Sequence, residues 1–202
     1  MTPLQRIAIG MVVVAIPADF GSECHAYDAL PDPIGWLVVL SGVWALGRTL
    51  DVDWAKWFGV LALVVSVPLW LPSVNQLLVP ACNPGHVQDS LRWGLSLPPF
   101  VFGFALSRTI GRNAQWQSPR DSFAAGRFGV LTWAFAACAV LPAVGYGADQ
   151  QGVLVGSFVL IGIVQVAFVY YLFRVHNRPW LGGPTVVDDA QTAAPEEPGR
   201  PS

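Results

Sequence analysis

Long uncharged stretches dominate the chain and predict helices that cross a membrane. Three of them, Trp57–Gly85, Phe128–Ala148 and Gly152–Phe173, contain no Lys, Arg, Asp or Glu. Each meets the roughly 18–20 residues that an α-helix needs to cross hydrocarbon about 30 Å thick. A soluble core does not require uncharged runs of this length, so the pattern predicts that lipid surrounds these segments.

Two shorter uncharged stretches, Pro33–Gly47 and Trp93–Ser107, are each about 22 Å long at 1.5 Å per residue. Arginines flank both of them, at Arg48 and Arg108. Long cationic side chains can extend along a helix to the headgroups, and a short segment can then cross the membrane. We therefore predict a span at each of these stretches.

The first apolar stretch, Ile7–Ala18, is the weakest span. Because Arg6 precedes it, a secretory signal is the alternative, but its end lacks a small-x-small cleavage pattern. We predict a retained span. The six predicted spans cover residues 4–20, 33–48, 56–79, 92–108, 127–148 and 152–174.

These six spans sort the positive charges. Of the 11 Lys and Arg residues, only Arg92 falls on one side. By the positive-inside rule, the opposite side is cytoplasmic and holds both termini. The cytoplasmic cations are Arg6, Arg48, Lys56, Arg108, Arg112, Arg120, Arg127, Arg174, Arg178 and Arg200.

Composition leaves little room for anything outside the membrane. Of the 202 residues, 53 % are hydrophobic and 12 % are charged, against roughly 25 % charged in soluble domains. We predict an all-α fold, a polytopic membrane helix bundle over residues 1–181. Residues 182–202 are rich in Gly, Pro, Ala and acidic side chains, which predicts a disordered cytoplasmic tail.

The chain contains an internal repeat. Ala55–Val74 aligns without gaps on Ala125–Val144, and Trp44–Leu50 matches Phe104–Ile110. The repeat predicts two or three tandem helical hairpins. Parallel repeats in membranes either enlarge a bundle or build a central pathway. The spans carry no Asp, Glu, Lys or Arg well inside them, which favours the enlarged bundle over the pathway.

Most tryptophans fall near the ends of the predicted spans, at the depth of the headgroups that indole rings favour. Trp44 and Trp133 lie deeper, and we predict that they pack inside the bundle. The others are predicted at the outer boundary (Trp36, Trp70, Trp93) or at the inner one (Trp54, Trp57, Trp116, Trp180).

Three further features predict contacts between helices. Gly152 and Gly156 are spaced for close approach of two helix backbones, and Gln165 suits an interhelical hydrogen bond. Pro98 and Pro99 together remove two backbone donors, which predicts a kink or a break in the fourth span.

Two of the three cysteines, Cys24 and Cys82, fall in outer loops, and Cys138 falls in the fifth span. An oxidising exterior favours a disulfide between the first two. Free thiols remain an alternative.

The same loops carry matching His-x-x-Asp motifs, His25 with Asp28 and His86 with Asp89. With the two loop cysteines they supply ligands that suit zinc or copper, although their spacing is unlike that of structural zinc sites. An outer polar or metal site is therefore the alternative to the disulfide. Local hydrogen bonding within the loops is the more common role of such histidines, and we favour it over a functional role.

The segment Asp28–Trp36, with the sequence Asp-Ala-Leu-Pro-Asp-Pro-Ile-Gly-Trp, has the residues of a helix start: Asp32 can cap it and Pro33 suits its first turn. This segment resembles one found in uncharacterised small multi-pass membrane proteins of actinobacteria and other Gram-positive bacteria. The resemblance implies a bacterial plasma-membrane location. It implies no activity.

The motifs of recognised chemistry are missing from the sequence, among them Gly-x-x-x-x-Gly-Lys, His-Glu-x-x-His, Gly-x-Ser-x-Gly and Cys-x-x-Cys. We therefore predict a non-enzymatic accessory or interaction component of the cell envelope, without a cofactor. Its predicted partners are the lipid bilayer and other membrane proteins, not nucleic acid. The alternative is a small transporter or channel for a cation or small solute, with an acidic outer rim.

Overall fold

A computed structural model describes residues 1–16, 19–20, 27–28, 32–71, 73–74 and 86–184. The α-helices are α1 (Pro3–Ala15), α2 (Asp32–Leu46), α3 (Asp53–Trp70), α5 (His86–Trp116), α6 (Ser122–Gly147) and α7 (Gln151–Val175). The antiparallel strands β1 (Asp19–Phe20) and β2 (Tyr27–Asp28) lie between α1 and α2, and the 3-10 helix η1 (Pro179–Leu181) follows α7.

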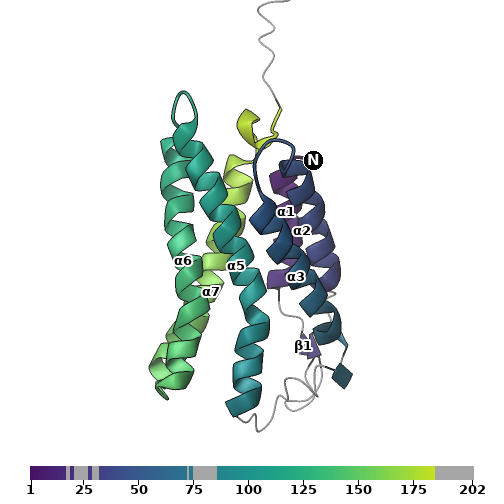
Figure 1. Ribbon diagram of the computed structural model, residues 1–202, viewed down its shortest axis with the longest axis vertical. Helices are drawn as coiled ribbons and strands as arrows, with labels where there is room; N and C mark the ends of the chain where they lie inside the picture. The colour runs from purple at the N-terminus through teal and green to yellow at the C-terminus, as the bar shows by residue number, and fades with distance from the viewer. Residues whose placement is uncertain (17–18, 21–26, 29–31, 72, 75–85, 185–202) are drawn as a thin grey trace, which may run out of the picture.

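Successive helices run in opposite directions and pack side by side in chain order (Figure 1). The last helix, α7, also packs against α1, so the bundle closes on itself. The start of α1, the α2–α3 and α5–α6 connections and the end of α7 all lie at one end (Figure 1). In the described residues, the predicted all-α arrangement of six α-helices that alternate in direction is confirmed.

Three helices, α3, α6 and α7, are long and apolar enough to cross a membrane. The apolar helices α1 and α2 are shorter, at 13 and 15 residues. Outward-facing apolar side chains line the long helices, an arrangement that is unfavourable in water over so wide an area. On α7 they are Val155, Phe158, Val159, Ile163, Val166, Tyr170 and Phe173. These features indicate a multi-pass membrane protein in contact with lipid.

Apolar side chains from α1, α2, α3, α5, α6 and α7 fill the centre of the bundle. Trp36 of α2 meets Phe102 of α5 edge to face, with ring centroids 5.3 Å apart. Because α2 begins at Asp32, Trp36 lies one turn inside the helix and is only 1 % exposed. The prediction that Trp36 anchors at the interface is therefore wrong, and its burial against Phe102 stabilises the core instead.

The two tryptophans that were predicted to pack internally face outward. Trp44 is 58 % exposed and Trp133 is 77 % exposed. Hydropathy gives depth along a helix but not the direction in which a side chain points, and the outer surface of a membrane bundle is also apolar. The prediction of internal packing is wrong for both residues.

Prolines decide where two helices end. α1 ends at Ala15 and α3 at Trp70, before the predicted limits at residues 20 and 79. The next residues, Ile16 (φ −87°, ψ 109°) and Leu71 (φ −80°, ψ 115°), are extended and precede a proline. Proline disfavours the α conformation of the residue before it, so each helix stops there.

α5 is longer than the predicted span 92–108 and runs without interruption through Pro98 and Pro99. The predicted break is therefore wrong, and the kink predicted as its alternative stays a prediction. The φ angle of proline is compatible with a helix, and a helix that opened in lipid would leave backbone groups without partners. The β1–β2 pair, in which Asp19 faces Asp28 in register, is an addition to the predicted all-α fold. Strands of two residues are too short to produce a periodic pattern.

Equivalent positions of the internal repeat have similar surroundings. Leu46 and Leu106 are fully buried, whereas the arginines two residues later, Arg48 and Arg108, are exposed. Each arginine therefore follows a core leucine at the same end of the bundle.

Candidate functional site at the cationic end

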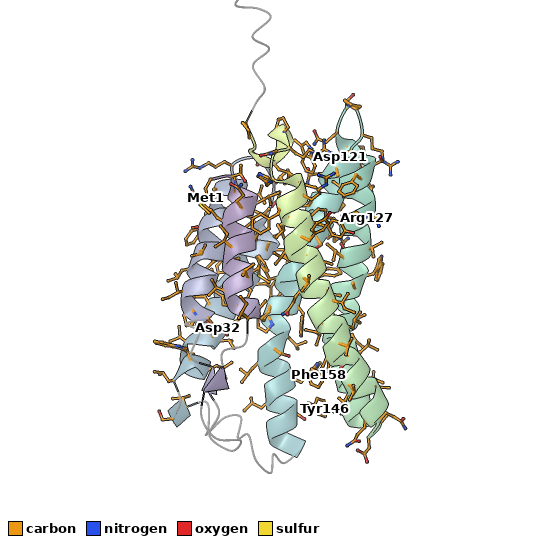
Figure 2. All side chains as sticks on the ribbon, turned by 180° about the vertical axis from the view of Figure 1, so that it is seen from behind. Met1, Asp32, Asp121, Arg127, Tyr146 and Phe158 are labelled. Atoms are coloured by element: carbon orange, nitrogen blue, oxygen red, sulfur yellow. The ribbon has the colours of Figure 1, made fainter. Side chains whose placement is uncertain are left out.

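We call the end that holds the start of α1 the cationic end (Figure 2, where Met1 and Asp121 mark it). The cations at this end of the described chain are Arg6, Arg48, Lys56, Arg108, Arg112, Arg120, Arg127, Arg174 and Arg178. All are exposed except Lys56, which is half-buried. Lys56 pairs with Asp53, with 2.8 Å between Nζ and Oδ1.

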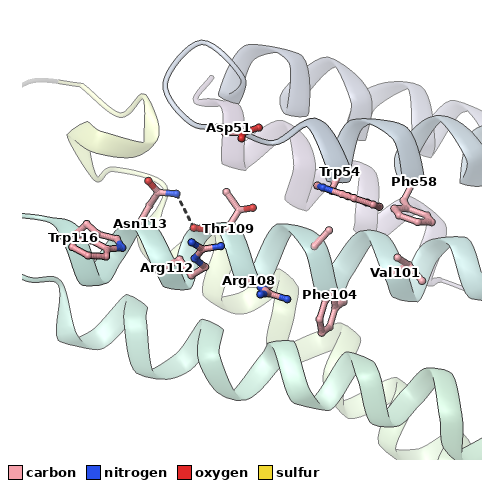
Figure 3. A pocket seen from close by; sticks show the side chains of 11 residues that line it. Asp51, Trp54, Phe58, Val101, Phe104, Arg108, Thr109, Arg112, Asn113 and Trp116 are labelled. Carbon is pink, nitrogen blue, oxygen red and sulfur yellow. Dashed lines mark hydrogen bonds between the residues drawn. The ribbon is translucent and has the colours of Figure 1, made fainter.

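An open groove of about 790 Å³ lies between α3 and α5 at this end. Figure 3 shows the side chains that line it. We call it the α3–α5 groove, and its lining consists of Asp51, Trp54, Phe58, Val101, Phe104, Ala105, Arg108, Thr109, Arg112, Asn113 and Trp116.

Helical spacing positions the polar side of the groove. Arg108 and Arg112 are four residues apart on α5, so both guanidinium groups lie on one face. Asn113 donates from Nδ2 to the carbonyl oxygen of Thr109 at 2.9 Å, which fixes the amide beside them. Neither arginine forms an ion pair within the described part of the chain. Their charge is therefore available to an anion.

Aromatic rings form the opposite wall. Trp54 and Phe58, one turn apart on α3, are stacked with centroids 6.1 Å apart. Trp54 is 74 % exposed, and Trp116 at the end of α5 is 83 % exposed. Val101 and Phe104 continue the apolar lining toward the bundle centre. The groove therefore combines cations near the helix ends with an apolar wall deeper along the helices.

A second cluster at the same end joins α6 to the segment after α7. Asp121 caps α6, because its Oδ1 accepts from the amide of Ala124 at 3.1 Å. Its Oδ2 lies 3.1 Å from Nε of Arg178. The guanidinium of Arg127 lies 5.9 Å from the ring centroid of Phe123. These contacts hold the connections at this end in place.

We expect Asp121→Ala to lower the free energy of unfolding by about 1 kcal/mol, because the cap of α6 is lost. Arg178 is 49 % exposed at its side chain, so the ion pair itself adds little. Thermal unfolding in mild detergent measures the change, and Arg120→Ala, at an exposed neighbouring position, serves as the control. Equal melting temperatures for the two variants would contradict the capping role.

The predicted outer site falls largely outside the described residues. Cys24, His25 and Cys82 are not among the described residues, so neither the predicted disulfide nor the predicted metal site is tested. Asp28 lies in β2, and His86 and Asp89 lie in the first turn of α5. β1 and the start of α5 lie at the end opposite the cationic end (Figure 1). Elsewhere in the described residues, no three His, Cys, Asp or Glu side chains gather as a metal site, and Cys138 is a buried free thiol.

The predicted helix contacts of α7 are not formed among the described residues. Gly152 and Gly156 are exposed, and a Cβ built on either would meet nothing within 4 Å. Gln165 is half-buried, and no hydrogen bond joins it to another described helix. An interhelical hydrogen bond occurs instead at Trp93, whose indole Nε1 donates to the carbonyl oxygen of Ala139 at 2.9 Å.

Close backbone approach is found between α1 and α2. A Cβ on Gly10 would lie 2.6 Å from the carbonyl oxygen of Gly35, and a Cβ on Gly42 would lie 2.6 Å from that of Pro3. Only glycine leaves room for backbones this near to each other. These three glycines, rather than those of α7, form the small-residue contact of the bundle.

Comparison of the chain with family models, curated proteins and solved structures finds no match.

Proposed function

We propose that this protein is a six-span component of a bacterial plasma membrane that acts through interactions and not through catalysis. The observation that carries the proposal is the outward-facing apolar surface of α3, α6 and α7, combined with cations gathered at one end. Lipid suits the apolar surface, and the positive-inside rule assigns the cationic end to the cytoplasm. Both termini are then cytoplasmic.

The short helices are compatible with six spans. α1 and α2 are about 20 and 22 Å long at 1.5 Å per residue, less than the hydrocarbon thickness of about 30 Å. Arg6 and Arg48, at their cytoplasmic ends, are exposed and free to extend toward headgroups. Local thinning of the bilayer compensates for the remaining difference between helix length and hydrocarbon thickness. In this proposal the hairpin repeat serves to enlarge the bundle, and the resemblance of Asp28–Trp36 supports the location.

We expect a protease to remove an epitope tag at the carboxyl terminus in inverted membrane vesicles and not in intact, right-side-out ones. Immunoblotting against the tag reads out both preparations, and a tag on a known periplasmic or extracellular loop is the control. Removal in right-side-out vesicles would overturn the orientation. Recovery of the protein in the soluble fraction would overturn the membrane assignment itself.

The accessory role follows from the chemistry of the interior. Its side chains are mostly apolar. Of the four buried hydroxyls in the described residues, those of Ser66, Thr132 and Ser157 donate to carbonyls of their own helices, and that of Ser107 on α5 has no hydrogen-bond partner. A transporter needs a polar route, whereas Trp36 and Phe102 occupy the centre of this bundle. We therefore favour the accessory role over the transporter. Purification in mild detergent after cross-linking tests it, and the repeated absence of a membrane-protein partner would count against it.

A further inference from the structure

We propose that the α3–α5 groove is a binding site for one anionic phospholipid of the cytoplasmic leaflet. The inference rests on the proposed function, because it requires the bundle to be embedded in a bilayer. It adds a ligand class and a defined site to that proposal.

The charge of the groove suits a phosphate. Arg108 and Arg112 present two guanidinium groups on one face of α5, and each can donate in a fork to phosphate oxygens. The carboxylate in the lining, Asp51, accepts from the amide of Asp53 at 3.3 Å. Two cations against one carboxylate leave the groove positive, and the neighbouring Asp53 is paired with Lys56. A monoanionic headgroup would neutralise the excess.

The apolar lining suits an acyl chain. Phe58 faces the groove from α3, and Val101, Phe104 and Ala105 face it from α5. On α5 these residues precede the arginines, so they lie deeper in the bundle than the charges do (Figure 3). A ligand with its anion at the arginines and a hydrocarbon chain along this wall matches both parts at once. A free phosphate would use only the first part.

The depth of the groove suits the headgroup region. Trp54 and Trp116, both strongly exposed, stand at its two sides. Indole rings concentrate at the membrane interface, and basic pockets between spans on the cytoplasmic side bind acidic headgroups. The arginines therefore lie at the level at which a lipid phosphate is found.

The test measures lipid binding to the full chain in detergent by native mass spectrometry. Phosphatidylglycerol is the probe, phosphatidylcholine is the neutral comparison, and inorganic phosphate is the competitor. We expect Arg108→Gln combined with Arg112→Gln to weaken phosphatidylglycerol binding about 30-fold. The matched control, Arg120→Gln with Arg174→Gln, removes the same charge from exposed positions at the same end outside the groove and should leave binding unchanged. All variants must elute as single peaks in size exclusion.

Each other outcome overturns the site. Equal weakening in both double variants would mean diffuse attraction by the cationic end. Equal binding of the two lipids would remove the role of charge, and displacement by millimolar phosphate would make the ligand a free anion.

A photo-cross-linking residue at Val101, with Ile163 as the reference position on the outer face, separates this failure from failure of the proposed function. If Ile163 labels lipid, but the lipid labelled from Val101 shows no preference for an anionic headgroup, the groove is not the proposed site. The membrane assignment then stands. Lack of lipid labelling at both positions overturns the membrane assignment as well.

Discussion

Replacing Gly10 and Gly42 together by alanine is expected to lower the free energy of unfolding by about 2–6 kcal/mol. A Cβ on Gly10 would lie 2.6 Å from the carbonyl oxygen of Gly35 and 2.8 Å from the amide of Val39. These are backbone atoms, which cannot turn aside as a flexible side chain does. Overpacking of this kind costs about 1–3 kcal/mol per site, and the two glycines meet different neighbours, so the costs should add.

The matched control is Gly152→Ala with Gly156→Ala on α7, where a new Cβ would meet nothing within 4 Å. Here alanine should leave stability unchanged or raise it slightly, because it is the better helix former. Unfolding in mild detergent, followed by size exclusion after heating, compares the two pairs. A loss in the control pair would mean that this face of α7 packs against another molecule. An unchanged melting temperature for the first pair would contradict the close approach of α1 and α2.

The general layout of this fold follows from the sequence because hydropathy and charge act over long segments. Apolar runs separated by arginines predict alternating helices, and the alternation places Arg48 and Arg108 at one end, as found. The ends of helices depend on single residues instead. Ile16 and Leu71 are apolar and extend the hydropathy signal, yet the proline after each of them stops the helix.

The direction of side chains was the main failure of prediction. Trp36 and Trp44 are eight residues apart on α2, but the first packs on Phe102 and the second faces outward. In a water-soluble helix a polar face identifies the outside, whereas in lipid both faces are apolar and this signal disappears. For the same reason, the spacing of Gly152 and Gly156 predicts a close helix contact, whereas the structure forms such a contact at Gly10, Gly35 and Gly42.

The α3–α5 groove was predictable in part. The four-residue spacings of Arg108 with Arg112 and of Trp54 with Phe58 place each pair on one helix face. What the spacing cannot supply is the adjacency of the two faces, since that depends on how α3 and α5 pack. The repeat pairs α2 with α5 and α3 with α6, and it contains no information about contact between α3 and α5.

A substitution on the outer face of α7 distinguishes lipid from water as the surroundings of this bundle. Ile163 lies at the middle of α7 and is 61 % exposed. In lipid, Ile163→Asp should raise the apparent free energy of membrane insertion of α7 by about 3 kcal/mol, the cost of a carboxylate at the centre of a span. In water the same change at an exposed site should stay within about 0.5 kcal/mol and improve solubility.

The measurement uses glycosylation acceptor sites placed on either side of α7 in the full chain, translated with microsomal membranes. The ratio of glycosylated forms reports the insertion free energy. Gln151→Asp, which adds the same charge at the first residue of α7, is the matched control. It should have a small effect, because it lies at the helix end, where water reaches the carboxylate and the amino-terminal dipole favours it. Equal effects of the two substitutions would place α7 in water, and the orientation, the short spans and the lipid groove would all lose their basis. A penalty confined to Ile163→Asp requires hydrocarbon at that depth, and α7 then crosses the membrane.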